Sequence, residues 1–115
     1  MAIKSINPYT LEISKSYDEM TNKEIDEAVN VAYSTYQNWK KTSFEERAAI
    51  LNNVSSILRS KKNELARLIT LEMGKLIKHA EYEIDYAVSI FEYYAENAKD
   101  FLADESLKVD VGEAF

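Results

Sequence analysis

One histidine, eight tyrosines and many carboxylates are the side chains of this sequence that could take part in chemistry. His79 and Glu83 are four residues apart, so on a helix they share one face and could ligate a metal ion together. A protein metal centre needs more ligands than this pair, and the chain has no second histidine. We therefore predict no metal site and interpret the pair as exposed helix side chains.

The carboxylates of residues 81–100 could in principle act as general acids or bases. Their spacing is not that of a catalytic pair: Glu96 and Asp100 would repel each other, and Glu96 with Lys99 is typical of a helix surface. No nucleophile is accompanied by a base and an orienting group. The sequence therefore predicts no catalytic residue; the carboxylates considered are Glu81, Glu83, Asp85, Glu92, Glu96 and Asp100.

Phosphate and thiol chemistry are excluded by composition. The chain has two glycines, Gly74 and Gly112, too far apart to form a Gly-rich phosphate loop. The dipeptide Gly74-Lys75 is followed by Leu76, where a phosphate loop requires serine or threonine. The absence of cysteine excludes disulfides, thiolate metal sites and a cysteine nucleophile within these residues. Composition therefore excludes a Gly-rich phosphate loop and any site built on cysteine within these residues.

Tyrosines gather in one part of the sequence, at Tyr82, Tyr86, Tyr93 and Tyr94. They could be packing residues whose hydroxyls lie at the rim of a core. They could equally form an apolar wall with polar tips, which suits a substrate channel. Residue types and spacing leave both interpretations open.

The elements that must position these side chains are mostly helices. The chain has the size of one domain, and its single proline, Pro8, lies near the start. Capping boxes at Thr21–Glu24 and Ser43–Glu46 mark two helix starts. We predict a mostly α fold with a β-hairpin over 1–18, a helix over 21–41, a helix over 43–73 with a break near 60–63, a long helix over 76–103, and the start of a strand over 107–115.

The long helix carries two apolar stripes, whereas a surface helix needs one. The second stripe consists of Tyr82, Tyr86, Ile90 and Tyr93 and predicts either a second covering layer or the wall of a cleft. The expected strand over 107–115 has no partner in its own sequence. We therefore expect this chain to be a piece of a larger protein.

The formal net charge of −6 excludes a broad basic surface, so neither nucleic acid nor an anionic membrane is an expected partner. No signal-like segment or long apolar run is present, which predicts a cytoplasmic protein.

Four short motifs resemble those of the NAD(P)-dependent aldehyde dehydrogenase family, most closely its succinate-semialdehyde dehydrogenase branch. Residues 6–12 are similar to the opening I-N-P-x-T-G-E, and residues 70–75 match T-x-E-x-G-K. Trp39 with Glu46-Arg47-Ala48 resembles W-(x)n-E-R-A, and residues 93–95 match Y-Y-A. Two positions depart from the pattern, since Leu11 replaces the usual glycine and Leu76 the usual proline.

The resemblance implies that these residues are the N-terminal part of the α/β aldehyde dehydrogenase fold. It implies an enzyme that oxidises a small aldehyde with NAD or NADP and forms a homo-oligomer. The catalytic cysteine, the glutamate and the dinucleotide site of that family would lie outside this chain, which alone should be inactive. The resemblance therefore implies no catalytic residue, no cofactor-binding residue and no bound cofactor in these residues. The resemblance also places Tyr82 and Tyr86 on the helix that lines the substrate channel. The alternative is a stand-alone helical protein-interaction module.

Overall fold

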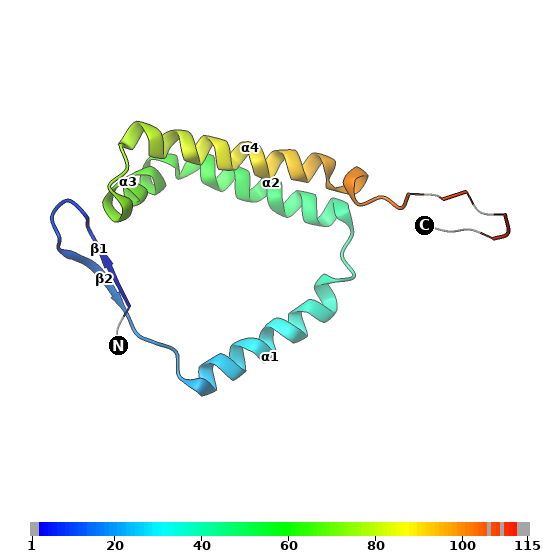
Figure 1. Ribbon diagram of the computed structural model, residues 1–115, viewed down its shortest axis with the longest axis horizontal. Coiled ribbons are helices and arrows are strands. Elements are labelled where there is room, and N and C mark those ends of the chain that lie inside the picture. The colour runs from blue at the N-terminus through cyan, green and yellow to red at the C-terminus, as the bar shows by residue number, and fades with distance from the viewer. Residues whose placement is uncertain (1–2, 106, 109, 113–115) are drawn as a thin grey trace.

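The computed structural model of the chain describes residues 3–105, 107–108 and 110–112. Within them, a two-stranded antiparallel hairpin precedes four helices (Figure 1). The mostly helical fold with an N-terminal hairpin is therefore confirmed. The elements are β1 (Ile3–Ile6), β2 (Ile13–Tyr17), α1 (Asn22–Trp39), α2 (Phe44–Ser60), α3 (Lys62–Met73) and α4 (Ile77–Phe101).

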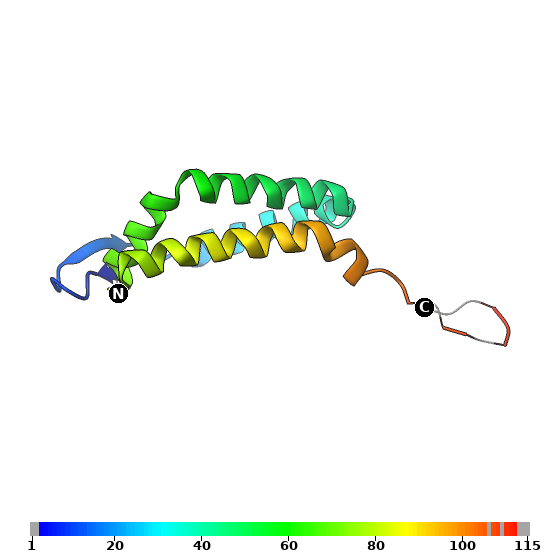
Figure 2. The same cartoon turned by 90° about the horizontal axis from the view of Figure 1, so that it is seen from above.

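Helix α4 lies along α2 and α3, and these three helices form one layer (Figures 1 and 2). The first apolar stripe of α4 supplies the core, because Ala80, Ile84 and Val88 are buried there. On the neighbouring helices, Ala66 of α3 and Ser55 of α2 are also buried. The Ser55 hydroxyl donates a hydrogen bond to the backbone carbonyl of Leu51. Small side chains at these positions allow close packing of the helices.

The helix expected over 43–73 with a break near 60–63 is α2 and α3 in the structure, and the break lies at Lys61 as expected. Lys61 lies between α2 and α3 with φ −101° and ψ 10°, outside the regular helical range. The next residue, Lys62, reaches across to Asp85 of α4, with 2.5 Å between Nζ and Oδ2. The break lets α3 change direction and remain in contact with α4, as Figure 2 shows.

Both expected capping boxes are confirmed. Thr21 Oγ1 accepts the backbone N–H of Glu24, and the Glu24 carboxylate accepts the N–H of Thr21. The Glu24 carboxylate accepts hydrogen bonds from the backbone N–H of Thr21, which has the larger effect, and from the Thr21 hydroxyl, and both hold the pKa of Glu24 below its ordinary value. Ser43 and Glu46 make the same reciprocal pair at the start of α2. Each box satisfies backbone donors that the first turn of a helix leaves unpaired.

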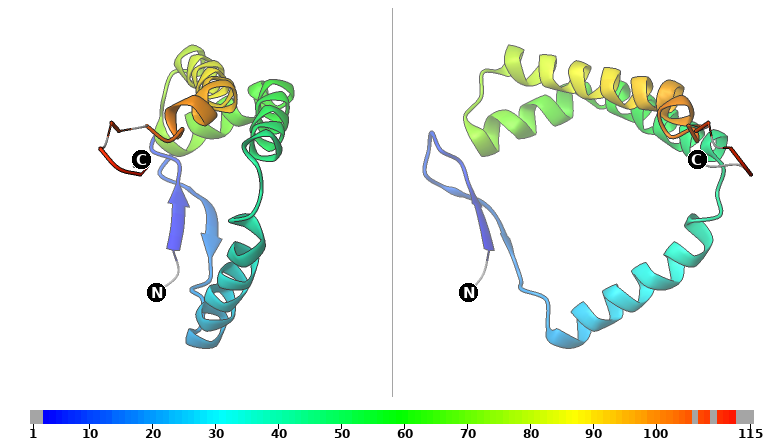
Figure 3. Two further views of the ribbon diagram at one scale, coloured as in Figure 1. Left: turned by 90° about the vertical axis from the view of Figure 1, so that its right-hand side faces the viewer. Right: turned by 45° about the vertical axis from the view of Figure 1, so that its right-hand side comes forward.

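Helix α1 stands apart from the three-helix layer and has no buried residue (Figures 1 and 3). Its apolar side chains follow helical spacing, yet Ile25, Val29 and Tyr36 are all exposed. Arg47 braces the turn between α1 and α2. Its guanidinium donates to Thr42 Oγ1 (2.9 Å) and to the carbonyl of Trp39 (3.2 Å), and it lies over the Trp39 ring.

The hairpin contains an irregular register and a strained turn. Ile3 pairs with Tyr17, but a bulge between Ser5 and Ile6 shifts the last pair to Ile6 and Ile13. Asn7 Oδ1 accepts the backbone N–H of Tyr9, which closes the predicted turn. Leu11, which replaces the usual glycine of the resembled motif, has φ +61°. A non-glycine residue is disfavoured in this left-handed region because its Cβ crowds the backbone.

The tip of the hairpin contacts the turn between α3 and α4. Ser5 Oγ donates to Glu72 Oε1 at 2.9 Å, and Pro8 lies against Gly74. Gly74 ends α3 with φ +70°, and its N–H donates to the carbonyl of Thr70. Residues 72–75 therefore act as a C-cap and a contact site for the hairpin.

The strand expected over 107–115 falls in part on residues 109 and 113–115, which lie outside the described residues. In the remaining part, Leu107 makes a single bridge and residues 110–112 form a bend. A strand needs a hydrogen-bonded neighbour along its length, and the described segment is not an extended strand beyond that one bridge.

Candidate functional site

The second apolar stripe of α4 is an exposed aromatic surface, which we call the tyrosine face and define as Tyr82, Tyr86, Ile90 and Tyr93. Since Ala80, Ile84 and Val88 turn toward α2 and α3, the helical period directs this stripe away from them. The exposed fractions are 68% for Tyr82 and 58% for Tyr86. Such exposure excludes packing in the core of the described residues, where a structural tyrosine would be covered.

The rings on this face are ordered relative to one another. Tyr82 and Tyr86 stack with ring centroids 6.3 Å apart and planes 5° from parallel. Further along α4, Tyr93 meets Tyr94 edge-on at 5.5 Å and Phe101 at 5.8 Å. Stacked and edge-to-face contacts are favourable arrangements for aromatic rings. The result is an exposed aromatic surface along one face of α4.

Ion pairs hold α4 against the helices behind it. Arg59 of α2 binds both carboxylate oxygens of Glu92 at 2.8 Å. Lys62 binds Asp85, and Lys75 binds Glu83. Each of these three carboxylates therefore pairs with a cation from a neighbouring segment.

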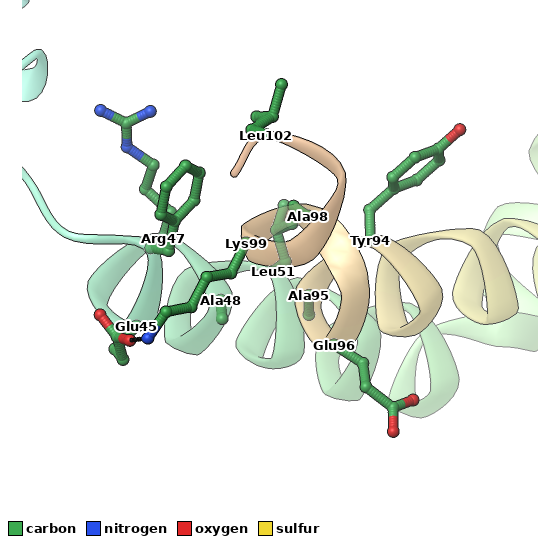
Figure 4. Close-up of a pocket in the computed structure, with 11 residues that line it drawn as sticks. Glu45, Arg47, Ala48, Leu51, Tyr94, Ala95, Glu96, Ala98, Lys99 and Leu102 are labelled. Carbon is green, nitrogen blue, oxygen red and sulfur yellow. Dashed lines mark hydrogen bonds and ion pairs between the residues drawn. The ribbon is translucent and has the colours of Figure 1, made fainter. Parts of the chain in front are cut away.

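A hollow of about 310 Å³ lies between the start of α2 and the end of α4 (Figure 4). Its apolar lining includes Ala48, Leu51 and Ala98, and an ion pair between Glu45 and Lys99 crosses its rim at 2.8 Å. The hydrogen bond from Lys99 lowers the pKa of the Glu45 carboxyl, and the same bond raises the pKa of the Lys99 ammonium. Both groups stay charged at neutral pH, so this pair is unsuited to proton transfer there.

His79 and Glu83 do not form a metal pair in the structure. The Glu83 carboxylate binds Lys75, and no group of three or more metal-binding side chains gathers within the described residues. Both glycines also lack the features of a phosphate cradle. The N–H of Gly74 is engaged by Thr70, and Gly112 has no atom near the position of a Cβ. Neither glycine is therefore part of a Gly-rich phosphate loop in the described residues.

The residues of the four motifs have structural partners. Arg47 contacts Trp39, Glu46 caps α2, and Glu72 and Gly74 hold the hairpin. The cap at Glu46 was expected from the sequence, whereas the contacts of Arg47 with Trp39 and of the hairpin with Glu72 and Gly74 were not. Sequence reasoning also missed Ser89, although its position three residues after Tyr86 placed it beside the tyrosine face. No helix in the described part of the chain combines the length and apolar character needed to cross a membrane.

Comparisons with known proteins agree with this arrangement. The sequence model of the Aldehyde dehydrogenase family matches residues 1–114. A succinate-semialdehyde dehydrogenase [NADP(+)] from Deinococcus radiodurans is 38% identical over 110 residues, which are 96% of this chain and 23% of that protein. The chain thus spans about a quarter of the length of the curated relatives it matches.

Solved structures are similar as well. The structure of Gox0499, described for its cofactor and substrate selection, matches this chain with a TM-score of 0.93 and 32% sequence identity. The match covers 98% of this chain and 25% of the Gox0499 chain. Succinate-semialdehyde dehydrogenase from Burkholderia pseudomallei has a TM-score of 0.85 and 29% identity and covers 96% of this chain and 23% of its own. On the family match and these relatives, the chain belongs to the aldehyde dehydrogenase family.

Proposed function

We propose that this chain is the N-terminal segment of an NAD(P)-dependent aldehyde dehydrogenase that oxidises succinate semialdehyde to its acid. The support is the 38% identity, over 96% of this chain, to a relative named for that substrate and for NADP. In the complete enzyme the nicotinamide cofactor would accept hydride from the substrate. The residues of this segment would supply scaffold and part of the substrate path, while the reacting groups come from the rest of the protein.

Within that enzyme, Tyr86 and its stacked neighbour Tyr82 form a wall of the aldehyde channel. The observation that carries this role is the parallel stack on an exposed face of α4, opposite the face that packs on α2 and α3. Flat aromatic side chains with hydroxyl tips bind the apolar part of a small substrate and orient its polar end.

The test replaces Tyr86 in the complete enzyme that contains this segment. Tyr86→Ala should change kcat/KM unequally for aldehydes of increasing chain length, because the lost ring widens the channel. Tyr86→Phe keeps the ring and is the matched control. If Tyr86→Ala left kcat/KM unchanged across the whole series, the channel role would be wrong.

The purified 115-residue chain alone should reduce neither NAD nor NADP, because the groups that do the chemistry are not among its residues. Measurable reduction of NAD or NADP by this chain with any aldehyde of the series would contradict the assignment of the reacting groups to the rest of the protein. We also propose that the complete protein is a cytoplasmic homo-oligomer, which sedimentation of the complete enzyme and its fractionation from cells would test.

A second candidate function, a helical interaction module, is favoured by the exposed apolar face of α1. Such faces bind partner helices or sheets, including a second copy of the same chain. Val29→Glu should then abolish self-association seen by light scattering, whereas Val31→Glu, an equally exposed valine on another face of α1, should not. A reading frame that continues past Phe115 into a cysteine-containing segment would instead favour the enzyme.

A further inference from the structure

The start of α4 lacks the features that begin α1 and α2. Those two helices start at capping boxes, with glutamates in their first turns. At the N-cap position of α4, Leu76 makes no side-chain hydrogen bond, and the first turn contains no acidic residue. Lys78 instead places a cation near the positive end of the helix dipole. The residues of this first turn therefore do little to stabilise it themselves.

Packing in the described structure adds little at the same place. Ala80 is the first buried residue of α4, whereas Leu76 and Ile77 before it are exposed. Because the free energy of burial grows with the apolar area removed from water, the small side chain of Ala80 contributes little. Among the described residues, the regular core of α4 begins with Ile84, two turns further along.

An ion pair spans this weak start. The Lys75 ammonium, just before α4, binds the Glu83 carboxylate in the second turn of the helix. Both side chains are partly covered, with exposed fractions of 29% and 47%. Lys75 directly follows Gly74, which ends α3 and lies against Pro8 of the hairpin. The pair therefore ties the second turn of α4 to a point held by α3 and the hairpin.

We propose that Lys75 is a positioning residue that substitutes for the missing cap of α4 and orders the turns from which Tyr82 and Tyr86 extend. Tyr82 directly precedes Glu83, and Tyr86 follows it by three residues, so all three neighbour one another on the helix. The stack of the two rings requires regular helical spacing between them. The inference rests on the proposed function, since the ordered rings are used in the channel wall.

The first test measures amide hydrogen exchange in the complete enzyme that contains this segment. Lys75→Met should speed exchange of the amides of residues 77–83 about fivefold, because loss of the pair frees an uncapped helix start. Lys75→Arg keeps the cation and should retain the protection. Lys62→Met is the matched control: Lys62 is similarly covered, at 32% exposed, and pairs with Asp85 away from the start of α4. It should leave exchange of residues 77–83 unchanged.

An added cap should replace the lost ion pair. The backbone of Leu76 already has the extended ψ of 133° that an N-cap residue adopts. Leu76→Asp, combined with Lys75→Met, supplies a side-chain acceptor there and should restore slow exchange. If Lys75→Met does not fold, Glu83→Gln breaks the same pair from the other side and should speed the same amides. Unchanged exchange of residues 77–83 in the folded variants would overturn the inference.

The second test measures kcat/KM for aldehydes of increasing chain length. Lys75→Met should change this series in the same direction as Tyr86→Ala, mainly through KM, and added Leu76→Asp should reverse the change. If Tyr86→Ala alters kcat/KM and Lys75→Met does not, the channel wall stands and the positioning role is wrong. If neither variant alters kcat/KM for any aldehyde, the channel role is wrong and the positioning role fails with it.

Discussion

Pro8 and Gly74 lie so close that a Cβ on Gly74 would be 3.1 Å from Cγ of Pro8. This contact joins the hairpin to the turn between α3 and α4, across 66 positions of sequence. Two independent constraints therefore favour glycine at position 74: the limited space beside the pyrrolidine ring and the left-handed φ of +70°. The same hairpin is tied by the hydrogen bond between Ser5 and Glu72.

Gly74→Ala should lower the free energy of unfolding by about 1–3 kcal/mol, since it adds left-handed strain and a close contact. Urea denaturation measures the change. Gly112→Ala is the matched control, because Gly112 also has a positive φ but nothing near its Cβ position. The part of this loss that comes from the close contact with Pro8 should disappear when Gly74→Ala is made in a Pro8→Ala background. An equal loss of unfolding free energy in both backgrounds would show that the contact with the pyrrolidine ring is unimportant.

Leu11 occupies a backbone conformation that suits glycine, with φ +61°. Because its side chain is 77% exposed, replacement removes little apolar packing. Leu11→Gly should therefore stabilise the chain by about 0.5–1 kcal/mol through relief of strain. The thermal midpoint measures this gain. Leu11→Ala keeps the Cβ and should give no comparable gain; if alanine stabilises as much as glycine, strain at this position is not the cause.

Arg47 should set the direction of α1, because its guanidinium holds the carbonyl and the ring of Trp39. Arg47→Ala should increase acrylamide quenching of Trp39, the single tryptophan of the chain, and lower stability by about 1–2 kcal/mol. Arg47→Lys should recover little of the lost stability, since a single ammonium group cannot reproduce the planar, forked set of N–H donors of a guanidinium. Arg59→Ala breaks a different ion pair and should leave the quenching unchanged; equal quenching in both variants would contradict the role.

The Glu45–Lys99 pair predicts a defined dependence of stability on pH. The pKa of Glu45 is lowered by Lys99, so its contribution is complete above the unfolded-state pKa of about 4.3 and is lost as pH falls through the folded-state pKa. The pKa of Lys99 is raised, so its contribution is complete below about 10.4 and is lost as pH rises through the folded-state pKa. Because both side chains are exposed, salt should weaken the effect.

Unfolding of the wild type and of Glu45→Gln, followed from acid to neutral pH, checks this dependence. The two proteins should differ at neutral pH and converge in acid. Lys99→Gln should show the same convergence, and the double variant should add little to either change. A difference that persists unchanged at low pH would contradict the pair's contribution.

The sequence alone was sufficient for local structure. Helix starts at Thr21 and Ser43 follow from capping boxes, which involve residues three positions apart and need no tertiary contact. The periodicity of α4 likewise separated Ala80, Ile84 and Val88, which are buried, from the tyrosine stripe. Four motifs in the expected order indicated the aldehyde dehydrogenase family, and the family match confirmed it.

Tertiary structure decided what depends on contacts between distant segments. Spacing along α4 did not show whether the tyrosines are covered, and packing on α2 and α3 leaves Tyr82 and Tyr86 exposed and stacked. The partners of Gly74 and Arg47 could not be inferred from spacing, because a local pattern fixes which face a side chain occupies but not which element meets that face. For the same reason the apolar stripe of α1 was recognisable in the sequence, whereas its exposure became known only from the fold.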